Sequence, residues 1–103
     1  MVTFNYNPDD KVLTATFSGR LDTIAVMKLS EIIQIKLPMT DGKSEEKIVF
    51  DLRDVDYISS SFIRICVNVA KQAAPGNFSI AHCQPFIKKT FKISGLDDIL
   101  HVS

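Results

Sequence analysis

The segment from residue 47 to residue 52 constrains the fold of this chain more than any other. It reads Lys-Ile-Val-Phe-Asp-Leu, a short and nearly continuous apolar run that is rich in β-branched residues. Such a run is typical of a central strand that is covered on both faces. The sequence therefore predicts that Ile48, Val49 and Phe50 lie in the middle of a β-sheet.

The segments on either side predict the remaining strands and the helices. Apolar residues recur at helical spacing in several of them, as at Phe62, Ile65 and Val69. In chain order we expect strands at 2–6 and 11–18, a helix at 23–37, a surface loop at 38–46, the strand at 47–52, a helix from about Ser60 to Ala74, a strand at 78–83, a helix from Pro85 to Gly95, and an edge strand in the tail at 99–102. This order, β-β-α-β-α-β-α-β, predicts an α/β fold with a mixed four- to five-stranded sheet and helices packed on it.

Length, composition and charge narrow the class of protein. The 103 residues contain no long Gly/Ser/Pro tether, so we expect a single domain that spans residues 1–103. Twelve basic and twelve acidic residues give zero net charge without a Lys/Arg-dense segment, which argues against nucleic acid as a partner. The chain starts without a signal-peptide pattern, and every apolar run is well short of about 20 residues. We therefore expect a cytoplasmic protein without membrane insertion.

The cysteines and histidines give no metal site. Cys66 and Cys83 each lie in an apolar pattern, where a free thiol behaves as a small hydrophobic group, so both are expected to be buried and reduced. His82 and Cys83 are neighbours, but adjacent side chains on a strand point to opposite faces and do not share an ion. We expect no metal and no cofactor.

Three consecutive serines, Ser59, Ser60 and Ser61, lie where the buried strand gives way to the second helix. One interpretation is capping, because a serine oxygen accepts a hydrogen bond from an unpaired amide at a helix start, typically worth about 1 kcal/mol. The other is covalent modification, because free amides and the positive end of the helix dipole favour a phosphate. A phosphate adds about −1.5 to −2 charges at neutral pH and could act as a switch.

Asp22 and the three serines are residue types that also occur in catalytic sites, so an enzymatic role has to be considered. Asp22 either caps the first helix or contacts a partner. A serine hydrolase would need a nucleophile elbow, but the chain has no Gly-x-Ser-x-Gly, and the bulky Phe62 and Ile63 follow the serines. The residues therefore predict no catalytic site, and the chain is not expected to be an enzyme.

Three motifs in the expected order resemble the STAS domains, the family named for sulfate transporters and anti-sigma factor antagonists. Gly19-Arg20-Leu21-Asp22 resembles the family's Gly-x-Leu-Asp turn. The stretch from Val55 to Arg64, Val-Asp-Tyr-Ile-Ser-Ser-Ser-Phe-Ile-Arg, resembles its central motif, with Phe62 at the usual glycine position. Phe-Lys-Ile-Ser-Gly-Leu at 91–96 resembles its closing Thr-Gly-Leu element. The resemblance covers nearly the whole chain.

The resemblance implies an anti-sigma factor antagonist that works by switching partners. Its partner would be an anti-sigma factor that is also a serine protein kinase of the histidine-kinase-like ATPase type, and phosphorylation would release the antagonist from it. Ser60 matches the phosphoacceptor, with Ser61 and Ser59 as alternatives. The implied partner-binding residues are Asp22, Ser59, Ser60, Ser61, Phe62 and Arg64. The alternative function is a STAS accessory subunit of a transporter or signalling scaffold, which uses the same face without phosphorylation.

Overall fold

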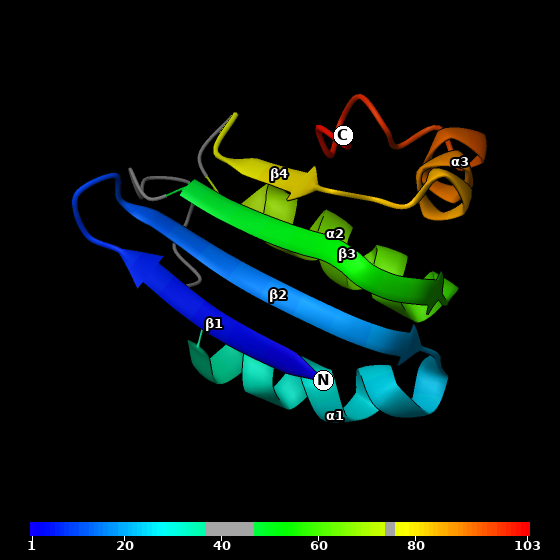
Figure 1. The fold of residues 1–103 in the computed structure, drawn as a ribbon, viewed down its shortest axis with the longest axis horizontal. Coiled ribbons are helices and arrows are strands. Elements are labelled where there is room, and N and C mark those ends of the chain that lie inside the picture. The colour runs from blue at the N-terminus through cyan, green and yellow to red at the C-terminus, as the bar shows by residue number, and fades with distance from the viewer. Residues whose placement is uncertain (37–46, 74–75) are drawn as a thin grey trace.

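A computed structural model describes residues 1–36, 47–73 and 76–103 of the chain, and the predicted loop at 38–46 lies outside these ranges. The elements are β1 (Val2–Asn7), β2 (Val12–Leu21), α1 (Thr23–Lys36), β3 (Lys47–Ile58), α2 (Ser60–Gln72), β4 (Phe78–Ala81) and α3 (Pro85–Ile93). The strands form a mixed sheet in the order β1-β2-β3-β4, shown in Figure 1. The first pair is antiparallel and the other two are parallel. The predicted α/β class and mixed sheet are confirmed.

The strand β3 is central in the sheet, but it is not covered on both faces. It lies between β2 and β4, as the apolar run predicted. Buried residues on β3 alternate with partly exposed ones, as at Ile48, Val49 and Phe50, and β2 shows the same alternation. Figure 1 places α1 and α2 behind the strands, with α3 beyond β4 at one end. The prediction of a doubly covered strand is therefore wrong, because one face of the sheet carries most of the packing.

Aromatic side chains form the centre of the core. Phe17 from β2 lies between Phe50 of β3 and Phe62 of α2, with ring centroids 4.9 and 5.2 Å away. Phe78 of β4 packs edge-on against Phe50 at 5.0 Å. Edge-to-face contacts at such distances are favourable geometries for aromatic pairs. Phe62 thus fixes the helix α2 to β2 and β3, and Val69 further along the helix is also buried.

The C-terminal tail differs from the predicted edge strand. Residues 97–101 form turns, and pairing with β4 is reduced to one parallel bridge between Ile80 and Val102. The backbone of Ile80 still makes hydrogen bonds on this side, because its amide donates to the oxygen of His101 and its oxygen accepts from the amide of Ser103. The tail therefore covers the edge of β4 without extending the sheet as a full strand.

The end of α3 lies where the sequence predicted. Gly95 has φ 74°, a conformation that glycine adopts without steric cost. The Leu96 amide donates to the oxygen of Phe91 at 3.1 Å, which gives the backbone pattern of a glycine-terminated helix.

Candidate partner-binding site

Ser59 is the structural member of the serine cluster. It is the N-cap of α2, and its hydroxyl oxygen accepts a hydrogen bond from the Phe62 amide at 3.4 Å. Its carbonyl oxygen accepts from the Ile63 amide at 3.2 Å, and its own amide donates to the oxygen of Leu21 at 2.9 Å. Its side chain is buried. The capping interpretation therefore holds for Ser59, which joins the end of β3 to the end of β2.

The other two serines occupy the first two positions of α2. Ser60 is exposed, whereas Ser61 is half-buried. The first amides of a helix have no acceptor within the helix, and the dipole makes this end positive. A group attached to the Ser60 hydroxyl would extend into solvent beside these amides, while Ser59 remains enclosed. The three hydroxyls are therefore chemically similar but differ in accessibility.

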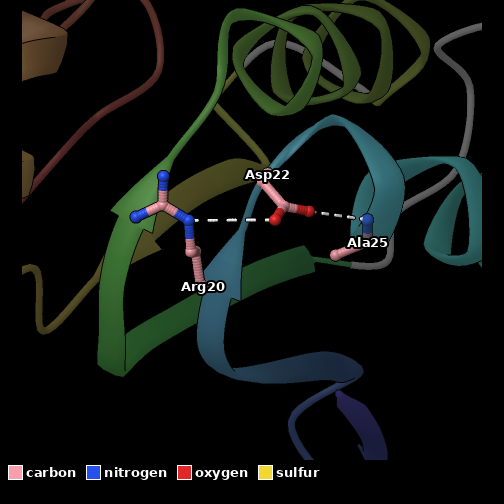
Figure 2. A network of polar contacts seen from close by, with 3 residues as sticks. All are labelled: Arg20, Asp22 and Ala25. Carbon is pink, nitrogen blue, oxygen red and sulfur yellow. Dashed lines mark hydrogen bonds and ion pairs between the residues drawn. The ribbon is translucent and has the colours of Figure 1, made fainter.

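Asp22 caps α1 at the same edge of the sheet. One carboxylate oxygen accepts from the Ala25 amide at 2.9 Å, and the carbonyl oxygen accepts from the Val26 amide at the same distance. The other carboxylate oxygen lies 3.8 Å from Nε of Arg20. Figure 2 shows the two contacts of the carboxylate, with the Ala25 amide and with Arg20. Asp22 follows Leu21, whose oxygen holds the Ser59 amide. The N-termini of α1 and α2 are therefore adjacent. The prediction that Asp22 caps the first helix is confirmed.

Arg20 was not among the predicted site residues, but the structure fixes it beside Asp22. Its guanidinium carbon lies 4.0 Å from the centroid of the Tyr57 ring. Arg20 and Tyr57 are register partners in the parallel pairing of β2 with β3. A cation over an aromatic face contributes roughly 0.5–1 kcal/mol at exposed sites. The contact thus orients an Arg20 side chain that remains 63% exposed.

A groove of about 470 Å³ runs between α1 and α2 next to the serine cluster. Ser61 and Arg64 line it from α2, and Met27 lines it from α1. Met27 is 69% exposed although it is apolar, and Arg64 is also exposed. Ser60 and Arg64 are four residues apart on one helix, which places them on the same face. Met27 is a candidate contact that the sequence prediction missed; its signal is an apolar residue on the outer side of α1.

Phe62 requires a correction. It was expected among the partner-binding residues, but its side chain is fully buried between Phe17 and Phe50. Its ring points into the core because α2 turns this face toward the sheet, so it presents no surface to a partner in this conformation. The earlier inference that Phe62 belongs to the apolar stripe of the helix is the one the structure confirms.

The remaining reactive groups are dispersed. Among the described residues, no three His, Cys, Asp or Glu side chains lie together in a way that could hold a metal ion. Both cysteines are free, with Cys66 buried and Cys83 half-buried. Burial raises the pKa of the Cys66 thiol well above its ordinary value, and burial is also the main reason that the pKa of Cys83 rises to about 11. No helix in the described ranges is long and apolar enough to cross a membrane.

Three comparisons with known proteins agree on the family. The STAS-domain family model matches residues 4–103. A Bordetella bronchiseptica protein, provisionally assigned as the anti-sigma factor antagonist BtrV, is 33% identical over 76 residues; the match covers 72% of this chain and 66% of that protein, just under two thirds. A STAS-domain antagonist structure from Planctomyces limnophilus aligns with TM-score 0.79 and 19% identity over 99% of this chain and 87% of that one. Bacillus SpoIIAA in its phosphorylated form aligns with TM-score 0.58 and 16% identity over 100% and 91%.

Proposed function

The chain belongs to the STAS-domain family, and from this premise we propose that it is an anti-sigma factor antagonist regulated by phosphorylation of Ser60. Its partner is an anti-sigma factor that is also a serine kinase of the histidine-kinase-like ATPase type. The kinase supplies ATP, and this chain supplies the acceptor hydroxyl and a binding surface. In this proposal the chain acts by binding, and it contributes no catalytic residue. The names of the similar proteins support the antagonist role.

One observation carries the choice of Ser60: it is the exposed serine of the cluster, at the first position of α2. A kinase has to bring the hydroxyl to the terminal phosphate of ATP, so the acceptor must reach solvent. The Ser59 hydroxyl is enclosed and engaged with the Phe62 amide. Ser61 faces the groove between α1 and α2 and is less accessible. A similar fold is known in a phosphorylated form, that of SpoIIAA.

The fold tolerates the proposed phosphate. Free amides and the helix dipole at the start of α2 stabilise an anion by about 0.3–1 kcal/mol. Arg64, one turn further along the same face, can form an additional ion pair with it, worth about 0.3–0.5 kcal/mol. Modification therefore leaves the domain folded and changes the surface around it.

The partner does not tolerate the phosphate in the same way. The groove beside the serine cluster is lined by Ser61, the neighbour of Ser60, together with the apolar Met27 and the cationic Arg64. A phosphate that attracts Arg64 withdraws that cation from the partner. The dianion must also be desolvated when the interface closes, and a surface ion pair with Arg64, worth well under about 1 kcal/mol, does not offset a desolvation cost of several kcal/mol. Phosphorylation is therefore expected to separate the two proteins.

Incubation of the purified chain with an anti-sigma factor kinase of the histidine-kinase-like ATPase type from the same organism, with ATP and magnesium, tests the proposal. Mass spectrometry should locate one phosphate on Ser60. The Ser60→Ala variant should bind the kinase but not be modified, and the matched Ser61→Ala variant should be modified like the wild type. If no phosphate appears on Ser59, Ser60 or Ser61, and Ser60→Asp binds as tightly as the wild type, the switch is refuted. Binding without phosphorylation would favour the accessory-subunit role.

A further inference from the structure

A second groove lies on the other side of α1, between this helix and the start of β1. It has a volume of about 580 Å³. Its lining includes Val2, Arg20, Asp22, Ile24, Lys28 and Ile32. Asp22 lies on this groove and also caps α1 beside Ser59, so the groove continues the surface that carries the serine cluster. A protein docked on that surface would reach the groove without crossing the domain.

The apolar part of this lining is unusual for a surface helix. Ile24 is 69% exposed and Ile32 is 40% exposed, although α1 already contributes the buried side chains of Val26, Leu29 and Ile33 to the core. A helix that is apolar on most of its surface is normally covered by other parts of a protein. The exposed isoleucines therefore form an apolar surface that the described part of the chain leaves open.

The charged part of the lining is predominantly positive. Arg20 and Lys28 contribute two cations, against the single carboxylate of Asp22. Within the described ranges Lys28 forms no ion pair, and the Arg20–Asp22 pair is long at 3.8 Å. The 4.0 Å contact with Tyr57 holds the Arg20 guanidinium in place, so Arg20 loses little conformational freedom on binding. An oriented arginine beside exposed apolar side chains has the properties of an interface hot spot.

We propose that this groove is a specificity site for the partner, which inserts an acidic side chain next to an apolar one. The carboxylate pairs with the Arg20 guanidinium, and the apolar side chain packs on Ile24, the exposed isoleucine nearer the start of α1. The inference rests on the proposed function, because the partner is the same anti-sigma factor kinase. It adds the partner's chemistry: an acidic and apolar segment that contacts the flank of α1, away from the serine.

Affinity measurements with the purified kinase test the groove separately from the switch. Arg20→Glu and Ile24→Ser should each raise Kd by about tenfold or more. The first removes the ion pair with the partner's carboxylate, and the second removes the apolar contact. Lys89→Glu and Ile93→Ser are matched controls, because they change an exposed lysine and an exposed isoleucine on α3, and they should change Kd by less than about twofold. Raising the salt concentration from about 0.05 to about 0.3 M should weaken the wild type more than Arg20→Glu.

The possible failures are distinguishable. If Arg20→Glu and Ile24→Ser bind like the α3 controls while Ser60→Asp has lost affinity, the groove is not part of the interface and the proposed function stands. If the wild type itself does not bind the kinase, both proposals are wrong. Should Arg20→Glu fail to fold, as judged by thermal unfolding, Lys28→Glu tests the same groove, because Lys28 is exposed on α1.

Discussion

Replacing Phe62 by alanine should destabilise the domain strongly, and the structure gives the size of the effect. The ring is fully buried and lies 5.2 Å from Phe17 and 6.2 Å from Phe50 between centroids. Removing a buried phenylalanine typically costs about 3–5 kcal/mol, because apolar burial is lost and a cavity remains. A domain of this size has a free energy of unfolding of roughly 5–15 kcal/mol. The variant should therefore lose a large part of the free energy of unfolding of the domain.

Urea unfolding followed by circular dichroism measures this loss. With a slope of about 2 kcal/mol per molar urea, the midpoint should fall by about 1.5–2.5 M. Phe86→Ala is the matched control, because that phenylalanine is 66% exposed on α3 and should change stability by no more than about 0.5 kcal/mol. A loss below about 1.5 kcal/mol for Phe62→Ala, or an equal loss for both variants, would refute the placement of Phe62 in the core.

Three further measurements test the helix cap at Ser59 and the two cysteine thiols. In urea unfolding, Ser59→Ala should cost about 0.5–2 kcal/mol, because the Phe62 amide loses its side-chain acceptor, whereas Ser60→Ala should stay within about 0.5 kcal/mol of the wild type; equal effects would contradict the assigned roles. For Cys83 the folded pKa of about 11 exceeds the ordinary value of 9.0, so the unfolded chain loses its proton first and stability should decrease as the pH rises from 9.0 to about 11. Cys83→Ala should reduce this decrease, and an unchanged pH profile would show that the thiol is not involved. In thiol labelling near neutral pH, Cys66 should react only on unfolding and Cys83 slowly, whereas rapid labelling of Cys66 in the folded protein would contradict its burial.

The sequence revealed the order of the elements up to α3 because most of them carry clear local patterns, but it did not reveal the full length of β3. The strand continues to Ile58, well beyond the predicted end at Leu52. After Leu52 the next buried residues are Val55 and Ile58, so buried positions recur every three residues instead of every two. The pairing of β2 with β3 also shifts register in this region. An irregular register removes the alternation by which a strand is recognised. The charged residues between these positions then resemble a loop.

The candidate site was predictable where it depends on local chemistry. Ser59 and Asp22 precede helices, and capping follows from that position alone. The Arg20–Tyr57 contact depends on how β2 aligns with β3, which is a long-range property that one sequence does not specify. The burial of Phe62 was also not predictable from its motif. A residue at a helix start can belong to a family motif and still point into the core. Only the packed structure separates Ser60, which is exposed, from Phe62, which is not.

The most direct test of the proposed switch compares the affinity of the kinase for the unmodified chain and for the chain phosphorylated on Ser60. Isothermal titration with a non-hydrolysable ATP analogue prevents modification during the measurement. Phosphorylation is expected to raise Kd by about a hundredfold or more, which corresponds to about 2.7 kcal/mol. Unfolding curves of the two forms should agree within about 1 kcal/mol, which would place the loss at the interface and not in the fold. Equal affinities for the two forms would contradict the proposed switch.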